Sequence, residues 1–293
     1  MNATACPRSW LFVPGDSEKK IAKIDGCGAD AIILDFEDAV APDRKDAARS
    51  IAADYLASCG PGDRPAKVWV RVNPFDTGLT QDDLAAVLSA RPDGIVQPKI
   101  EGPADVSRLS EMIARIGGGT LPIMPIATET PRAVLALSGF ADADLPDLFA
   151  MTWGAEDLSA ELGASTNLDA SGAFAEVYRV ARSMMLLAAH AAGVPAIDTL
   201  HADFRDLDGL LASSRAARAE GFSGRLAIHP AQVAPINEGF TPSPEEIERA
   251  KRISDAFAAE PGVGTVGLDG RMIDRPHLRA AEKTLAQARA LGL

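Results

Sequence analysis

The sequence lacks the features of secreted and membrane-spanning proteins. Its three cysteines, Cys6, Cys27 and Cys59, are odd in number and show no CxxC spacing, which argues against a disulfide framework and a cysteine-bound zinc. The N-terminal segment has no charged stretch followed by an apolar one, so no signal peptide is expected. The longest apolar run, residues 184–189, is much shorter than the roughly 20 residues that cross a bilayer. We therefore expect a cytoplasmic protein with no membrane partner.

Basic charge is also scarce. The chain holds 29 Lys and Arg against 41 Asp and Glu, a net charge of −12. A general nucleic-acid binder needs a basic face that displaces counterions, so no nucleic-acid partner is expected. A local basic site for an anionic ligand is still compatible with this balance. The 293 residues, 47% of them apolar, are enough for one large α/β domain.

Short β-branched runs alternate with longer amphipathic stretches, as in parallel βα units. The expected strands are 10–13, 31–35, 67–72, 94–98, 121–127, 148–153, 196–198 and 226–229. The expected helices are 17–27, 43–58, 80–90, 103–116, 131–139, 172–192, 205–220 and 243–259. Eight of each predict a closed (β/α)8 TIM barrel.

The alternative fold is an open, doubly wound sheet, which usually carries a glycine-rich phosphate turn after its first strand. The nearest match here, Gly26-Cys27-Gly28, precedes a strand instead of following one. The barrel is therefore favoured, and these glycines are interpreted as a helix end and a turn.

The barrel pattern stops near Gly264. We expect residues 1–260 to form the catalytic barrel and residues 261–293 a C-terminal extension, with strands at 265–268 and 272–274 and a helix at 276–291. A barrel needs nothing after its eighth helix. The extension is therefore expected to be a lid or an oligomer contact.

Polar residues gather at the C-terminal ends of the expected strands, whereas the N-terminal ends are mostly Gly, Pro, Ala and Leu. They are Asp35-Phe-Glu37-Asp38, Arg71-Val-Asn73, Gln97-Pro-Lys99, Thr128-Glu129-Thr130, Gly154-Ala-Glu156-Asp157, Asp198-Thr199 and His229-Pro230. Barrel enzymes carry their chemistry on that face. The asymmetry predicts an active site at this rim, although loops that follow strands are commonly polar as well.

Carboxylates dominate the rim, and neither cysteines nor several histidines accompany them. Such hard oxygen ligands suit Mg2+ or Mn2+ and not zinc. Glu129 and Asp157, on neighbouring strands, are the candidate ligands. The alternative is that they are salt-bridged or helix-capping residues.

Three other polar residues admit two interpretations each. Arg71 is placed to hold a carboxylate or a polarised carbonyl, or to pair internally with Glu37 or Asp38. Lys99 is either a Schiff-base nucleophile or, as we favour, the partner of a carboxylate. His229 is either a general base or, as we favour, a hydrogen-bonded structural histidine before Pro230.

One apolar stripe has helical spacing. It runs through residues 177, 180, 181, 184, 187 and 188, and we interpret it as core packing.

Eight strings occur in an order that is recognisable. They are WLFVPG (10–15), ILDFEDAV (33–40), VRVN (70–73), QPK (97–99), TET (128–130), WGAEDL (153–158), AIDT (196–199) and AIHP (227–230). Together they resemble the citrate lyase β-subunit-like branch of the HpcH/HpaI aldolase family, from residue 8 to the last helix. The resemblance implies a barrel of the phosphoenolpyruvate-binding type, usually a homotrimer.

The resemblance also implies an activity and a site. The activity is Mg2+-dependent C–C cleavage or formation of a malyl- or citramalyl-CoA thioester, with a 2-oxoacid as the other partner. Glu129 and Asp157 match the family's metal ligands, Glu129 also contacts substrate, and Arg71 matches its substrate-binding arginine. Asp274 matches an acidic catalytic residue that reaches across a subunit interface. Glu37, Asp38 and Lys99 are expected to support the site.

Two alternatives to this activity stay open. One is a citryl-thioester lyase subunit of a carrier complex, which the lack of an arginine in residues 163–167 disfavours. The other is a malyl-CoA thioesterase. Lys19, Lys20 and Lys23 are candidates for binding coenzyme A, or else form a solvated helix face.

Overall fold

A computed structural model describes residues 6–117 and 119–293. Residues 1–5, part of the segment in which no signal peptide is expected, lie outside the described residues. The main sheet contains β1 Ser9–Pro14, β2 Ala31–Asp35, β3 Lys67–Arg71, β4 Gly94–Gln97, β5 Ile123–Pro125, β6 Met151–Thr152, β7 Ala196–Asp198 and β8 Gly224–Ala227.

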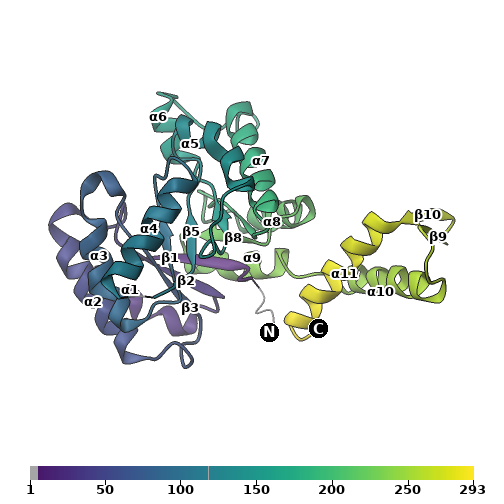
Figure 1. Ribbon diagram of the computed structural model, residues 1–293, viewed down its shortest axis with the longest axis horizontal. Coiled ribbons are helices and arrows are strands. Elements are labelled where there is room, and N and C mark those ends of the chain that lie inside the picture. The colour runs from purple at the N-terminus through teal and green to yellow at the C-terminus, as the bar shows by residue number, and fades with distance from the viewer. Residues whose placement is uncertain (1–5, 118) are drawn as a thin grey trace.

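These eight strands pair in the order β5-β4-β3-β2-β1-β8-β7-β6, and every recorded pair in this sheet is parallel. Parallel bridges from Ile123 to Leu148 and from Ile126 to Thr152 join the two edges. The sheet therefore closes, and the predicted (β/α)8 barrel is confirmed (Figure 1).

Two strands, β5 and β6, are much shorter than predicted. The sequence predicts strands over 121–127 and 148–153, whereas β5 and β6 span three and two residues. Pro122 and Pro125 lack an N–H and cannot donate to the ladder, which limits the pairing at this seam to isolated bridges. The chain nevertheless follows the predicted course there.

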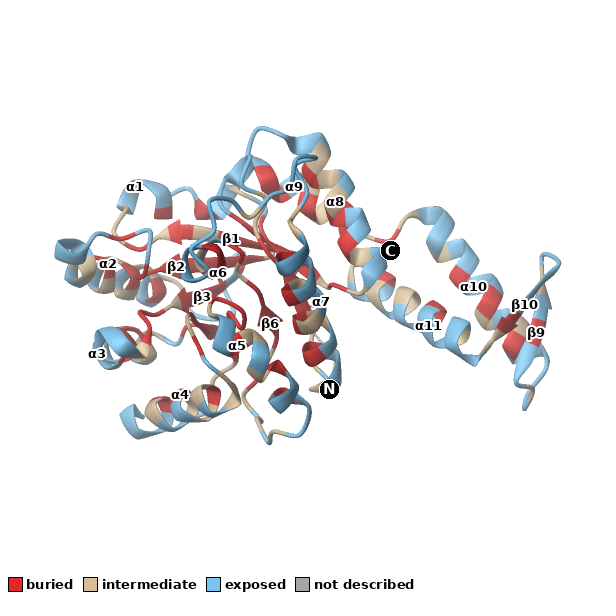
Figure 2. Ribbon diagram, turned by 90° about the horizontal axis from the view of Figure 1, so that it is seen from above, coloured by how far each residue is buried: buried red, intermediate tan, exposed pale blue. Residues whose placement is uncertain are grey.

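Helices surround the barrel. They are α1 Glu18–Ile21, α2 Lys45–Ser58, α3 Thr80–Val87, α4 Pro103–Ile116, α5 Pro131–Ala136, α6 Glu156–Glu161, α7 Glu176–Ala191, α8 Leu207–Glu220 and α9 Val233–Gly239. Figure 2 shows their inner faces buried against the strands and their outer faces exposed. The sequence does not predict α6 and α9, since helices this short leave little amphipathic periodicity. In the described residues, no helix is long and apolar enough to cross a membrane.

The barrel interior has its own apolar core, separate from the layer between strands and helices. Trp10, Trp69 and Phe149 fill it, with the two indole rings 5.1 Å apart at an interplanar angle of 70°. Gly94 makes room for this packing, because a Cβ there would lie 2.3 Å from the Trp69 ring. The interior is thus a packed plug and not a pore.

Residues 244–293 form a separate unit, which we call the C-terminal arm. It contains α10 Pro244–Ala259, an antiparallel ribbon of β9 Thr265–Leu268 and β10 Arg271–Asp274, and α11 Arg275–Ala290. The arm has its own small core, to which α10 contributes Ala250, Ile253 and Phe257. Figures 1 and 2 both show it projecting away from the barrel.

The position of α10 differs from the prediction. The sequence assigns 243–259 to the barrel as its eighth helix and begins the extension at 261. In the structure α9 follows β8, and the apolar face of α10 packs on α11. The arm therefore begins at Pro244, directly after the Ser243 cap of α10.

Candidate active site

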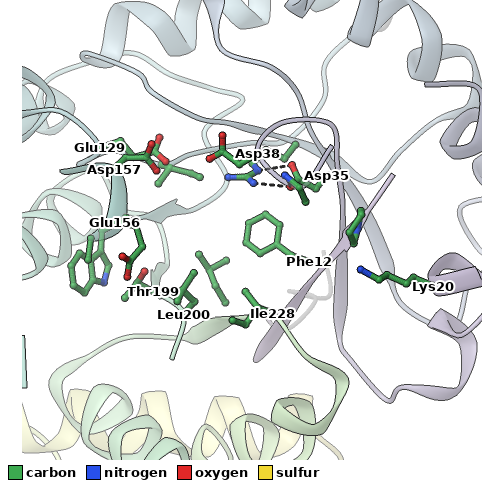
Figure 3. Close-up of a pocket in the computed structure, with 18 residues that line it drawn as sticks. Phe12, Lys20, Asp35, Asp38, Glu129, Glu156, Asp157, Thr199, Leu200 and Ile228 are labelled. Atoms are coloured by element: carbon green, nitrogen blue, oxygen red, sulfur yellow. Dashed lines mark hydrogen bonds and ion pairs between the residues drawn. The ribbon is translucent and has the colours of Figure 1, made fainter. Parts of the chain in front are cut away.

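A cavity of about 420 Å3 opens at the C-terminal ends of the strands (Figure 3). It is lined by Phe12, Pro14, Lys20, Asp35, Asp38, Ala39, Arg71, Ile126, Glu129, Trp153, Gly154, Ala155, Glu156, Asp157, Thr199, Leu200, Leu226 and Ile228. Phe12, Ile126 and Leu226 also belong to the packing of the barrel interior, so the plug forms an apolar floor. The cavity combines that floor with charged walls.

The two predicted metal ligands lie together on one wall. Glu129 follows β5 and is buried, whereas Asp157 stands in the first turn of α6 and is partly exposed. Figure 3 shows the two carboxylates side by side. Burial, followed by the negative charges of Asp157 and Glu37, raises the pKa of Glu129 well above its usual value. The protein alone thus leaves a negative charge on Glu129 poorly compensated.

These residues fit a divalent cation that prefers oxygen. Five carboxylates, Asp35, Glu37, Asp38, Glu129 and Asp157, lie around the cations of Arg71 and Lys99, and Lys45 lies near three of them. Among the described residues, no group of three or more His, Cys, Asp or Glu is arranged to hold a metal. Magnesium commonly takes one or two carboxylates and completes its shell with water and substrate oxygens, so a carboxylate pair suffices.

Arg71, at the end of β3, is held in a fixed orientation. Its Nε and Nη2 each donate to Asp35 at 2.7 Å, and Nη1 lies 2.7 Å from Glu37 Oε2. Burial alone would raise the pKa of Asp35, but the charge and hydrogen bonds of Arg71 outweigh it and lower that pKa. Each terminal nitrogen of Arg71 retains a further N–H, and the side chain lines the cavity. Arg71 is therefore both internally paired and available to a ligand.

Lys99 contacts three of the carboxylates at the site, Glu37, Asp157 and Glu129. Its Nζ lies 2.5 Å from Glu37 and 3.3 Å from Asp157, and its backbone N–H donates to Glu129. The residue adopts φ = +51°, a left-handed conformation that is strained for a lysine. That conformation aims the N–H at Glu129, so both the backbone and the side chain of Lys99 position carboxylates.

We expect borohydride, added together with substrate, to leave the activity and the intact mass unchanged. A Schiff base requires a neutral amine. Burial disfavours the Lys99 ammonium, but Glu37 and Asp157 outweigh this effect and raise its pKa. Activity and mass spectra with and without borohydride provide the check. A reduced adduct on Lys99 with loss of activity would restore the nucleophile interpretation.

The remaining predicted residues are more dispersed. Asp38 is mostly exposed and lies 3.7 Å from Lys99 Nζ, not against Arg71. Lys20 lines the rim of the cavity, whereas Lys19 and Lys23 do not line it. Asp274 lies at the end of β10 on the projecting arm, outside the cavity of its own chain (Figure 1). There it caps α11, and a hydrogen bond from His277 lowers its pKa.

Two other polar rim positions are structural. The His229 ring accepts the N–H of Ala231 and caps a short helix, as the structural interpretation predicts. Asp198 does not line the cavity. It is buried and bound by Arg225 at 2.6 Å, Arg182 at 3.1 Å and the Trp153 indole N–H at 2.7 Å.

Asp198→Asn is expected to destabilise the fold by about 3–5 kcal/mol, because it leaves buried arginines without a counter-charge. Burial opposes the charge on Asp198, but Arg225 and Arg182 outweigh it and lower the pKa. The folded pKa then lies below the unfolded value of about 3.9, so this stabilisation is present above about pH 4 and is lost in acid. The melting temperatures of the variant and of wild type should differ at pH 7 and converge at pH 3. An equal difference at both pH values contradicts this assignment.

The sequence alone does not single out Asp35, the main partner of Arg71. The signal is present in the register, because Asp35 and Arg71 are Cα partners on neighbouring strands. Opposite charges at facing positions near the ends of parallel strands meet directly. Predicted strand boundaries are too imprecise to reveal such a pair.

A closed barrel with carboxylates, an arginine and a cavity at the C-terminal end of its strands is the arrangement of a barrel enzyme. Comparison with known proteins gives the family. A sequence model of the HpcH/HpaI aldolase/citrate lyase family matches residues 8–230. The chain belongs to this family and is a carbon–carbon lyase.

Individual relatives cover almost the whole chain. A mitochondrial citramalyl-CoA lyase of Rattus norvegicus is 36% identical over 300 residues, which span 97% of this chain and 86% of the relative. A (3S)-malyl-CoA thioesterase of Cereibacter sphaeroides is 36% identical over 286 residues, spanning 97% and 95%. The structure of CitE from Mycobacterium tuberculosis in complex with magnesium, acetoacetate and coenzyme A is 33% identical, with a TM-score of 0.80 and coverage of 99% and 100%.

Proposed function

We propose that this protein is a Mg2+-dependent lyase that cleaves or forms the C–C bond of a malyl- or citramalyl-CoA thioester. We further propose that it acts in the reducing cytoplasm, where unpaired cysteines are usual. The observation that carries the proposal is that one cavity holds both the carboxylate pair and a fixed arginine. Glu129 and Asp157 lie side by side in it (Figure 3), and Arg71, which is held by Asp35 and Glu37, lines the same cavity. The relatives named for citramalyl-CoA and malyl-CoA chemistry support the thioester class.

Glu129 and Asp157 are the proposed ligands of Mg2+ (or Mn2+). A bound ion there would supply Lewis-acid polarisation and a template for the carboxylate and adjacent oxygen of the 2-oxoacid half. The chain's part is to keep both carboxylates converged, through the Lys99 N–H on Glu129 and the Lys99 ammonium beside Asp157. Glu37 and Asp38 in turn hold that ammonium.

Arg71 is proposed to stabilise the enolate oxygen that develops on the thioester carbonyl as the C–C bond breaks. Asp35 and Glu37 fix the plane of the guanidinium. Its two remaining terminal N–H groups are therefore already oriented before a substrate binds. Lys20 at the rim is the proposed contact for an anionic group of coenzyme A. This contact would offset the acidity of the chain locally.

Asp274 is proposed to transfer the proton, as base in condensation and as acid in cleavage. Because it lies on the arm and outside its own cavity, it would serve the site of a neighbouring copy, in a homo-oligomer that we expect to be a trimer. The site would then be completed across a subunit boundary.

A screen of purified protein against malyl-, citramalyl- and citryl-CoA, with Mg2+ and with EDTA, tests the proposal. The expected result is Mg2+-dependent release of a 2-oxoacid from a malyl- or citramalyl-CoA thioester, abolished by EDTA. Full activity in EDTA contradicts it, and turnover of citryl thioester only on an acyl-carrier subunit would replace it with the carrier-complex alternative. The thioesterase relative makes hydrolysis the second candidate; free malate without glyoxylate would identify it.

A further inference from the structure

Helix α2 begins with a lysine at a position that is unfavourable for the helix. Lys45 is the first residue of α2, where a positive charge opposes the helix dipole. Its side chain is half-buried, and among the described residues no carboxylate oxygen lies within 4 Å of its ammonium. Arg49, one turn further along the helix, instead pairs with the buried Asp83 at 2.8 Å. Neither helix formation nor ion pairing therefore accounts for the position of Lys45.

The ammonium of Lys45 binds the backbone on both sides of the Glu37 Cα. Its Nζ donates to the Phe36 carbonyl at 2.6 Å and to the Glu37 carbonyl at 2.8 Å. These two oxygens belong to the peptide planes before and after Glu37, and the rotation of those planes sets its φ and ψ. The Glu37 N–H in turn donates to Asp35 at 2.9 Å. One ammonium and one carboxylate thus fix the direction in which the Glu37 side chain leaves the backbone.

The Glu37 side chain carries this orientation into the site. It is buried, with Oε2 2.7 Å from Arg71 Nη1 and Oε1 2.5 Å from Lys99 Nζ. The same Lys99 ammonium lies 3.3 Å from Asp157. A displaced Glu37 would therefore turn the guanidinium and release the ammonium. Lys45 does not line the cavity, so it acts on the site only through the Glu37 loop.

Anchoring of α2 alone does not explain these contacts. The helix already buries Ala48, Ala52 and Leu56 on its inner face, and Arg49 ties it to α3. Burial lowers the pKa of Lys45 and outweighs the neighbouring carboxylates that raise it. A lysine whose pKa is lowered by folding binds its proton more tightly in the unfolded chain, so at neutral pH its charge disfavours the fold. Stability therefore gives no reason for a cation at this position.

We infer that Lys45 is a positioning residue for the lyase reaction. From outside the cavity, it holds Glu37 in the orientation that fixes both Arg71 and Lys99. The inference rests on the proposed function, in which Arg71 stabilises the enolate oxygen and Lys99 keeps the metal carboxylates together. A misplacement of about 1 Å far from the chemistry can cost about a hundredfold in rate. Loss of Lys45 is thus expected to affect turnover more than folding.

Steady-state kinetics of Lys45→Met provide the first test, with malyl-CoA and citramalyl-CoA as substrates in saturating Mg2+. Methionine keeps an unbranched stem and removes the charge and its donors. The kcat should fall by about a hundredfold, with KM and melting temperature close to those of wild type. Lys67→Met should match wild type, because Lys67 pairs with Asp93 at the opposite end of β3. A wild-type kcat in Lys45→Met, or a loss matched by a smaller folded fraction, overturns the inference.

A double-variant cycle tests the path through Glu37. Glu37→Gln removes the charge that holds Arg71 and Lys99, and it should itself lower kcat by about tenfold or more. In that background Lys45→Met should cost less than about threefold further, because the orientation that it preserves is already lost. Losses that multiply as if the two sites were independent would overturn the inference.

Hydrogen exchange tests the orientation without any substrate. The peptide 33–40 contains two amides that donate to Asp35. Exchange in this peptide should be faster in Lys45→Met, whereas exchange in 196–199, at the end of β7, should match wild type. Lys67→Met should match wild type in both peptides. Unchanged exchange at 33–40, or faster exchange throughout the barrel, contradicts the positioning role.

These outcomes separate the inference from the proposed function. Normal turnover by Arg71→Lys would refute the proposed role of Arg71. A slow Lys45→Met whose 33–40 peptide exchanges faster would then keep Lys45 as a positioning residue that acts through Lys99. Conversely, an inactive Arg71→Lys beside a fully active Lys45→Met would refute the inference and keep the proposed function.

Discussion

Glu129→Gln is expected to lower Mg2+-dependent turnover by about a thousandfold or more. Each tenfold loss of rate corresponds to about 1.4 kcal/mol of lost transition-state stabilisation. A metal that acts as a Lewis acid contributes several kcal/mol of that stabilisation. The substitution keeps the shape of the side chain and an oxygen that accepts the Lys99 N–H. It removes the charge that a cation requires.

The same substitution should not weaken the metal-free fold. Burial and the charges of Asp157 and Glu37 raise the pKa of Glu129, so its ionised form is disfavoured when no cation is bound. Loss of that charge is expected to leave the melting temperature in EDTA unchanged or higher. Function and stability are thus predicted to move in opposite directions.

Calorimetric titration with Mg2+ and melting in EDTA test both parts. Glu111→Gln, an exposed glutamate on α4, is the control and should match wild type in both. Wild-type affinity for Mg2+ in Glu129→Gln would remove Glu129 from the proposed ligand set. Unfolding of the metal-free variant would instead make Glu129 a structural residue.

Asp274→Asn is expected to reduce turnover by about 10²–10⁴-fold while substrate binding is retained, the usual range for a lost acid–base group. In the single chain Asp274 caps α11 and contacts His277. Asparagine preserves much of that cap, so the arm should stay folded. Asp255→Asn, at an exposed position on α10, is the matched control.

Complementation then tests whether the residue acts between copies. The Arg71→Lys variant should have a defective cavity and an intact arm. The Asp274→Asn variant should have an intact cavity and a defective arm. Mixing the two inactive variants under conditions that exchange subunits should restore part of the activity. A mixture as inactive as its components would confine Asp274 to its own chain or to a structural role.

The barrel and much of its rim were predictable from the sequence, because each rests on local signals. Buried parallel strands such as β2 read as apolar runs, and Glu129, Asp157 and Arg71 stand where those runs end. The barrel then brings strand ends together without further information.

Other features depend on non-local geometry. Asp35 pairs with Arg71 only in one strand register, and α10 has an apolar face that suits the barrel and α11 equally in sequence. Likewise, Val177 and Leu187 have the spacing of core residues, and only the fold shows that they face outward. A periodic apolar stripe predicts one face of a helix, but it does not show whether the barrel covers that face.

The packed interior of the barrel has a practical consequence. The chain contains only three tryptophans. Trp10 and Trp69 lie in the plug whose upper layer is the cavity floor, and Trp153 lines the cavity itself. All intrinsic indole emission therefore originates at or beneath the site, so unlabelled protein carries its own optical reporter of ligand binding.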